Sequence, residues 1–206
     1  MSFPDKPYGS IKTFLRDYTG RYATAQESVS ETALVRAAEI LVAAYTGGHS
    51  VYACGNGGSA AISNHLHCDH AKGVRTDTPL MPRVTSLAAN LELITAIAND
   101  ISYDDVFVYQ LQSLGRPGDV LISISSSGDS ENIVRAVSWA KAQGIQTIAM
   151  TGFSGGRSGA LADVHLHVNA DNYGVIEDVH QSLMHVLAQY IRQAHMTESD
   201  VRDRKF

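Results

Sequence analysis

The chain has 206 residues, 44% of them hydrophobic, and a formal net charge of -5 at pH 7. This length is enough for one sizeable core and short for two ordinary domains, so we expect a single domain over residues 1–206. The acidic balance argues against a nucleic-acid partner, and because no run approaches the roughly 18 apolar residues of a membrane span, we expect no membrane partner either.

Two helical patterns open the chain. Apolar residues recur at helical spacing across residues 30–45, Ser30 stands where an N-cap belongs, and glycines at 47 and 48 end the pattern. A weaker pattern runs from Ile11 to Tyr22 and is interrupted by Gly20. We therefore expect an N-terminal helical extension over about residues 8–46, ahead of any strand.

Five short apolar runs then alternate with helical patterns. The runs cover residues 51–54, 84–87, 119–124, 147–151 and 164–168, and the helical patterns fill 60–72, 90–114, 130–143 and 176–195. The longest run is apolar nearly throughout, as expected for a strand covered on both faces. This alternation predicts an α/β fold, a three-layer sandwich around a parallel sheet, with a polar and frayed tail over about residues 197–206.

The cysteines and the N-terminal residues bear on the compartment. Only Cys54 and Cys68 occur, and the first residues lack the basic and apolar regions of a signal peptide. Free thiols in a reducing compartment are therefore expected. The sequence indicates a cytoplasmic protein.

Two loops rich in glycine and serine each join a predicted strand to a helix. CGNGGS occupies residues 54–59, and SSSGDS occupies residues 125–130. Both place backbone N–H groups at a helix N-terminus, and the second adds four hydroxyls, an arrangement that suits a small phosphate. The first loop is neither GxGxxG nor a P-loop, so a nucleotide is not implied. Either loop alone is also explained as a tight turn with a helix cap, but two of them favour anion binding.

Taken together, the two loops resemble the SIS (sugar isomerase) domain, specifically its phosphoheptose isomerase branch. The leading helices, the Asn99-Asp100 pair and the closing segment 176–185 fall in family order. The resemblance implies a five-stranded parallel sheet of Rossmann-like or flavodoxin-like type, a homotetramer, and active sites at subunit boundaries. It also implies a sugar-phosphate substrate bound by Asn56, Gly57, Ser59, Asn99, Asp100, Ser125, Ser126, Ser127, Ser130 and Glu177.

A second set of residues carries the chemistry. His65 and Asp69 stand at i and i+4, on one face of a predicted helix, so both could reach one ligand or metal. The resemblance implies that His65 is a zinc ligand and that Asp69 replaces a glutamate acting as base and metal ligand. It also puts Glu177 at the place of a glutamine ligand and His185 at the second acid/base group. The implied site has Asp69 and His185 as catalytic residues and one zinc ion held by His65, Asp69, Glu177 and His185, a chemically sensible donor set.

This zinc set contains one geometric difficulty. Eight residues separate Glu177 from His185, and a continuous helix would spread them about 12 Å along its axis. Either the helix begins late, or Glu177 reaches inward. Ordinary surface or core roles are expected for the histidines at 67, 70, 165, 167, 180 and 195.

Residues 65–70 also spell HxHxDH, a metal motif of metallo-β-lactamase-like hydrolases. On a helix, residues two apart point to different sides, so these side chains could not converge on one site. The later ligands and the layered architecture of that fold are absent from the sequence as well. We therefore reject the hydrolase interpretation.

Four positions depart from the isomerase pattern: Asp69 for glutamate, Glu177 for glutamine, Gly174 for aspartate and Asp129 for asparagine. Asp69 is one methylene shorter, and a misplacement of about 1 Å can cost on the order of a hundredfold in rate. A carboxylate at 129 would repel phosphate unless it turns away or is neutralised. The changes suggest a divergent branch with retuned chemistry.

The expected reaction is an aldose–ketose isomerisation, from sedoheptulose 7-phosphate to D-glycero-D-manno-heptose 7-phosphate through an enediol. Such a reaction needs two titratable groups, which Asp69 and His185 can supply. Two alternatives are a non-catalytic tetrameric SIS regulator of the type that binds a replication initiator, and a module that senses sugar phosphates. The retained histidines 65 and 185 argue against a pure scaffold.

Overall fold

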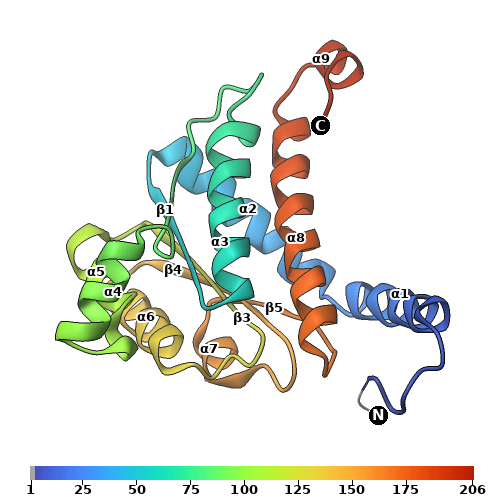
Figure 1. Cartoon of the computed structure of the whole chain (residues 1–206). Helices are drawn as coiled ribbons and strands as arrows, with labels where there is room; N and C mark the ends of the chain where they lie inside the picture. Colours follow the sequence, from blue (N-terminus) through green and yellow to red (C-terminus); the bar gives the residue numbers. More distant parts are fainter. Residues whose placement is uncertain (1–2) are drawn as a thin grey trace.

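The computed structural model describes residues 3–206, and a five-stranded sheet in which every pair is parallel forms its centre (Figure 1). The strand order is β2-β1-β3-β4-β5. The strands are β1 (Ser50–Gly55), β2 (Arg83–Ser86), β3 (Val120–Ser125), β4 (Gln146–Thr151) and β5 (Val164–His167).

Helices cover both faces of this sheet. One layer holds α1 (Ile11–Glu27), α2 (Glu31–Gly47), α3 (Gly58–Cys68) and α8 (Tyr173–Ala194); the other holds α4 (Leu91–Asp100), α5 (Val108–Leu114) and α6 (Glu131–Ala142). Alternate residues of β1 divide between them, since Val51 and Ala53 pack in the first core and Tyr52 and Cys54 in the second. The predicted three-layer α/β sandwich is confirmed.

Several predicted helices differ in their bounds. The pattern at 90–114 is broken into α4, a 3₁₀ turn (Tyr103–Asp105) and α5, because Ser102 caps a new start by accepting the N–H of Asp104. A short helix, α7 (Gly156–Leu161), was not predicted. The tail expected to fray contains α9 (Glu198–Asp203), which Thr197 caps through its hydroxyl. Within residues 3–206, no helix is both long and apolar enough to cross a membrane.

The strand order contains a switch point that matters for function. From β1 the chain adds β2 on one side and later β3 on the other, so the carboxyl ends of β1 and β3 lie next to each other where the winding reverses. Open α/β sheets bind ligands at such a point. The CGNGGS loop follows β1 and the SSSGDS loop follows β3, so both predicted anion loops lie there.

The second loop is fixed by a close approach of two backbones. Gly128 has φ 69°, and a Cβ at this position would collide with the carbonyl of Gly155. The carbonyl of Gly128 accepts the N–H of Ser158 at 2.9 Å, and that of Ser126 accepts the N–H of Gly152 at 2.8 Å. Residues 125–130 are therefore held against the segment that precedes and begins α7.

We predict that Gly128→Ala destabilises the fold more than Gly144→Ala does. Both glycines have positive φ, which costs another residue about 1–2 kcal/mol. At Gly144, however, the nearest atom to a new Cβ is Pro117 Cβ at 3.7 Å, which is ordinary contact. In urea unfolding, Gly128→Ala should lose at least about 1 kcal/mol beyond the loss for Gly144→Ala. Equal losses would contradict the backbone contact.

Candidate active site

Helices α3 and α8 lie side by side on one face of the sheet and carry the candidate site (Figure 1). On α3, Ile62 and Leu66 are buried in the core, which leaves His65 on the outer side. On α8, Val179 and Leu183 are among the buried residues, whereas His185 is half exposed. Because the apolar side of each helix packs on the sheet, polar side chains of α3 and α8 meet along the line where the two helices are in contact.

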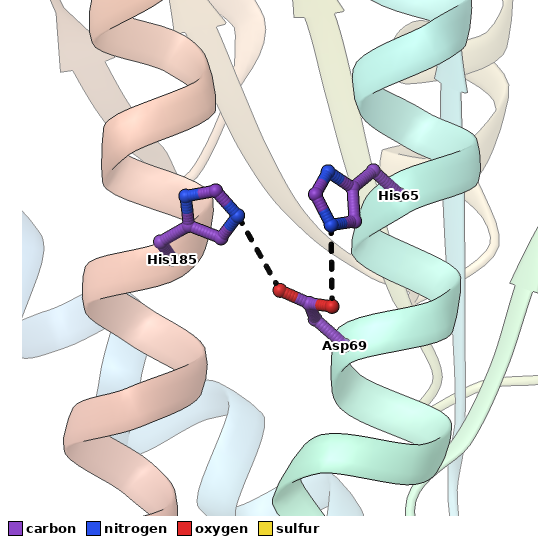
Figure 2. Close-up of side chains that lie close together, drawn as sticks. All are labelled: His65, Asp69 and His185. Carbon is purple, nitrogen blue, oxygen red and sulfur yellow. Dashed lines mark ion pairs between the residues drawn. The ribbon is translucent and has the colours of Figure 1, made fainter. Parts of the chain in front are cut away.

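Three of the predicted residues meet between these helices, as Figure 2 shows. Asp69 lies in the middle: its Oδ1 is 3.3 Å from Nε2 of His65, and its Oδ2 is 3.5 Å from Nε2 of His185. The two imidazole rings meet edge to face with centroids 5.0 Å apart. We refer to His65, Asp69 and His185 as the His-Asp-His cluster.

The donor atoms of this cluster fit a divalent cation. One nitrogen from each imidazole and one carboxylate oxygen all lie within 4.8 Å of one another. Two imidazoles and a carboxylate are ligands that zinc accepts, and three protein ligands with an open position are typical of catalytic zinc sites. The side chains remain 29–47% exposed, so a small molecule could reach a bound ion.

The backbone changes its winding where the carboxylate stands. After Cys68, α3 continues as a π-helix (Asp69–Val74), in which hydrogen bonds span five residues instead of four. The sequence predicts an ordinary helix over 60–72, since no residue pattern marks a π-helix. Such wider turns occur often at functional sites, and this one begins at Asp69.

Glu177 lies outside the cluster. Helix α8 is continuous from Tyr173, so it does not begin late, and the expected rise of about 12 Å separates Glu177 from His185. Its carboxylate instead lies against Gly58, where a Cβ would collide with it. Glu177 is thus at the start of α3, next to the first anion loop.

Gln181, which was not among the predicted site residues, contacts both imidazoles of the cluster. Its Nε2 is 3.0 Å from Nδ1 of His65 and 3.4 Å from Nε2 of His185. It stands one turn before His185 on α8, at i and i+4, and that spacing on a helix already assigned to the site is the signal that could have identified it.

The serines of the second loop gather as predicted at the end of β3. Ser126 is buried, and its hydroxyl has no hydrogen-bond partner within residues 3–206. Ser130 is the N-cap of α6, but its hydroxyl caps no backbone N–H there. Oγ of Ser125 accepts the N–H of Gly128, and Oγ of Ser127 accepts that of Asp129. Ser126 and Ser130 thus have no partner in the loop, whereas Ser125 and Ser127 use only an acceptor position, so each of the four keeps its O–H as a donor.

The acidic residue in this loop is neutralised. Asp129 Oδ1 accepts the backbone N–H of Arg157 at 3.0 Å and its Nε–H at 3.2 Å. The backbone N–H of Arg157, together with its guanidinium, lowers the pKa of the Asp129 carboxyl. Arg157 also pairs with Glu131 at 2.9 Å. The carboxylate is therefore turned toward a cation on α7.

Of the remaining predicted residues, those of the first loop lie at the start of α3, and Asn99 and Asp100 lie at the end of α4. Asn56 and Asn132 exchange amide hydrogen bonds of 2.9 and 3.0 Å, which tie the first loop to the helix that follows the second. Gly57 is the N-cap of α3, and Ser59 is buried in its first turn. Asn99 and Asp100 hydrogen-bond to each other at the end of α4, in the layer opposite the cluster.

A family model described as the SIS domain matches residues 14–152. The chain belongs to the SIS domain family. It is 36% identical over 170 residues to a phosphoheptose isomerase from Shewanella sp. (strain ANA-3), covering 81% of this chain and 85% of that protein. Among the curated and structural relatives, SIS-family proteins named phosphoheptose isomerase recur, so this chain is an isomerase of that type.

Solved structures of the family have the same fold. Phosphoheptose isomerase from Neisseria gonorrhoeae is 31% identical, with a TM-score of 0.81, and the match covers 89% of this chain and all of that one. The enzyme from Francisella tularensis is 30% identical, with a TM-score of 0.79, and the match covers 89% of this chain and 96% of that one. The resemblance stated from the two loops is confirmed.

Two other histidines of this SIS domain are fully buried. His70 follows Asp69 but points away from the cluster, with Nδ1 2.6 Å from the hydroxyl of Tyr45. His180 lies on the core side of α8. Burial lowers the pKa of each to about 4. Because His70 and His65 face different sides, the HxHxDH spacing does not form a site.

Because these imidazoles are buried in the neutral form, we predict that the free energy of unfolding falls at acid pH. An unfolded histidine takes up a proton below pH 6.5, but a folded one does so only near pH 4, so stability is complete above pH 6.5 and falls as the pH drops between these values. Each contributes up to about 1.4 kcal/mol per pH unit. In urea unfolding from pH 7 to 4.5, His180→Met should give a shallower decline than the wild type. Parallel declines would contradict the neutral buried imidazole.

Proposed function

We propose that the chain is an aldose–ketose isomerase acting on a sugar phosphate, and that it interconverts sedoheptulose 7-phosphate and D-glycero-D-manno-heptose 7-phosphate. The observation that supports this most is the Asp69 carboxylate between two imidazoles, beside two anion-type loops. The names of the relatives support the sugar-phosphate class. No observation favours the regulatory or sensing alternatives.

In this proposal Asp69 is the base. Its carboxylate takes the proton from the carbon next to the substrate carbonyl, the electrons of that C–H bond form the enediolate double bond, and the carbonyl oxygen takes up negative charge. His185, 3.5 Å from Asp69, is the second acid/base group and protonates or deprotonates the two neighbouring oxygens. Asp69 then returns its proton to the adjacent carbon, which regenerates the carboxylate and completes the exchange.

We propose zinc as the cofactor, one ion per site, held by His65, Asp69 and His185. A zinc ion held there would act as a Lewis acid for the negative charge that develops on the substrate oxygen. Glu177 lies too far along α8 to share this ion within one subunit, so we assign it to substrate binding together with the first loop.

The phosphate anchor in this proposal is the second loop. The Ser126 hydroxyl has no protein partner within the described residues, the Ser130 hydroxyl caps no backbone N–H, and the N-terminus of α6 that follows favours an anion as helix N-termini do. Ser59, Ser125 and Ser127 complete the set, with Asn56, Gly57, Asn99 and Asp100 retained as substrate-binding candidates. Because Arg157 neutralises Asp129, the loop keeps its capacity for an anion.

We further propose a cytoplasmic homotetramer in which residues 1–206 form one domain. Helix α1 supports association, since Ile11 is 80% and Leu15 is 61% exposed on it. Apolar side chains left on a helix that contacts mainly α8 suit a subunit contact.

Asp69→Asn should abolish turnover and retain substrate binding. The amide cannot accept the proton, whereas the serine loop is unchanged, so proton NMR of sedoheptulose 7-phosphate should show no aldose product while calorimetry still detects the sugar phosphate. His185→Ala should behave likewise. The same NMR experiment on the wild type, with a panel of ketose and aldose phosphates and with or without zinc, tests the function itself. Wild-type turnover by Asp69→Asn would rule out this base.

Arg157→Met should weaken sugar-phosphate binding by about tenfold, because it leaves the Asp129 carboxylate without its cation next to the phosphate. The double variant Arg157→Met with Asp129→Asn should recover the wild-type affinity in calorimetry. Failure of the second substitution to restore binding would mean that Arg157 contacts the phosphate itself.

A further inference from the structure

Gln181 contacts both histidines of the His-Asp-His cluster, and on His65 it faces the ring nitrogen that Asp69 does not face. Its amide lies 3.0 Å from Nδ1 of His65, whereas Asp69 lies 3.3 Å from Nε2 of the same ring. Gln181 and His185 both line a groove of about 580 Å³ between α1 and α8. The two nitrogens of His65 therefore have different and specific partners.

The partner of Nδ1 decides what Nε2 can do. A neutral imidazole carries one N–H and one lone pair, and a hydrogen bond at one nitrogen fixes the state of the other. When Gln181 offers its NH₂ group, Nδ1 must accept, so Nε2 carries the hydrogen and donates it toward Asp69. In that arrangement His65 cannot bind a metal through Nε2.

The opposite end of the same amide reverses this state. Rotation of the amide by 180° puts Oε1 where Nε2 lies, and Oε1 accepts the Nδ1–H of His65. The lone pair is then on Nε2, facing Asp69 and His185, whose donor atoms lie within 4.8 Å. An outer acceptor of this kind orients metal-binding histidines generally, and its loss typically lowers metal affinity 10–100-fold.

We propose that Gln181 is the positioning residue of the site: its side-chain oxygen holds His65 with Nδ1 protonated, and its amide turns over when a divalent cation enters. This inference rests on the proposed function, since it assumes that the cluster holds zinc. The amide has both a donor and an acceptor end, so the cluster can satisfy its hydrogen bonds with and without the ion.

Zinc affinity of Gln181 variants tests the proposal. Gln181→Leu removes the acceptor and should weaken zinc binding about 10–100-fold in competition with a chelating dye. Gln181→Glu retains an acceptor and should bind zinc at least as tightly as the wild type. Gln189→Leu, an exposed glutamine two turns further along α8, is the matched control and should leave affinity unchanged. Thermal unfolding of the metal-free proteins checks that all variants fold.

Nitrogen-15 NMR of the histidine rings gives a readout that packing alone would not move. In the zinc-loaded wild type and Gln181→Glu, His65 should carry its proton on Nδ1, and in Gln181→Leu this proton should exchange rapidly with water. Wild-type affinity and spectra in Gln181→Leu would overturn the proposal, and so would equal weakening by Gln181→Glu.

The outcomes for the wild type separate this inference from the proposed reaction. Zinc binding with the predicted His65 state, but without conversion of any sugar phosphate, would overturn the isomerase proposal and support the role of Gln181. Isomerisation that persists in a protein unable to bind zinc would overturn the role of Gln181 and support the reaction.

Discussion

The packing of α3 beside α8 on one face of the sheet is the constraint on which the candidate site depends. The apolar side chains of both helices pack in the same core, which fixes the position of one helix along the axis of the other. The polar side chains of the two helices therefore meet in fixed pairs. Gly58 lies opposite Glu177, and the pair His65 and Asp69 lies opposite His185. A shift of one helix by a turn would move about 5.4 Å and separate every one of these pairs.

Much of this arrangement follows from the sequence, because hydrophobic periodicity and the order of elements fix a parallel three-layer fold. The loops at 54–59 and 125–130 could be assigned to strand ends, and those ends meet at the switch point of the sheet. The i, i+4 spacing of His65 and Asp69 is a local property of one helix, so it was also accessible. Their meeting with His185 came from family resemblance.

What the sequence could not supply were contacts that depend on the register between elements. Arg157 reaches Asp129 from a six-residue helix that no periodic pattern predicts, and Gln181 is one of several polar residues on α8 until α3 is placed beside it. The π-helix that begins at Asp69 was likewise not predictable, because no residue pattern marks it. The place of Glu177, in contrast, followed from the sequence. The expected helical rise of about 12 Å separates it from His185, so it could not share one metal ion with that residue within a subunit.

Two of the departures from the isomerase pattern lie on the facing segments of the candidate site, Asp69 in the π-helix after α3 and Glu177 on α8. The side chain of Asp69 is one methylene shorter than that of glutamate. The backbone widens into a π-helix at this residue, which changes the position of its Cα and hence of its carboxylate. Glu177 adds a second carboxylate at the start of α3, about 12 Å from His185 along the axis of α8. Because Asn56 and Asn132 hold the two loops together, the proposed phosphate anchor on the serine loop is fixed relative to the start of α3, the segment that carries His65 and continues into the π-helix with Asp69.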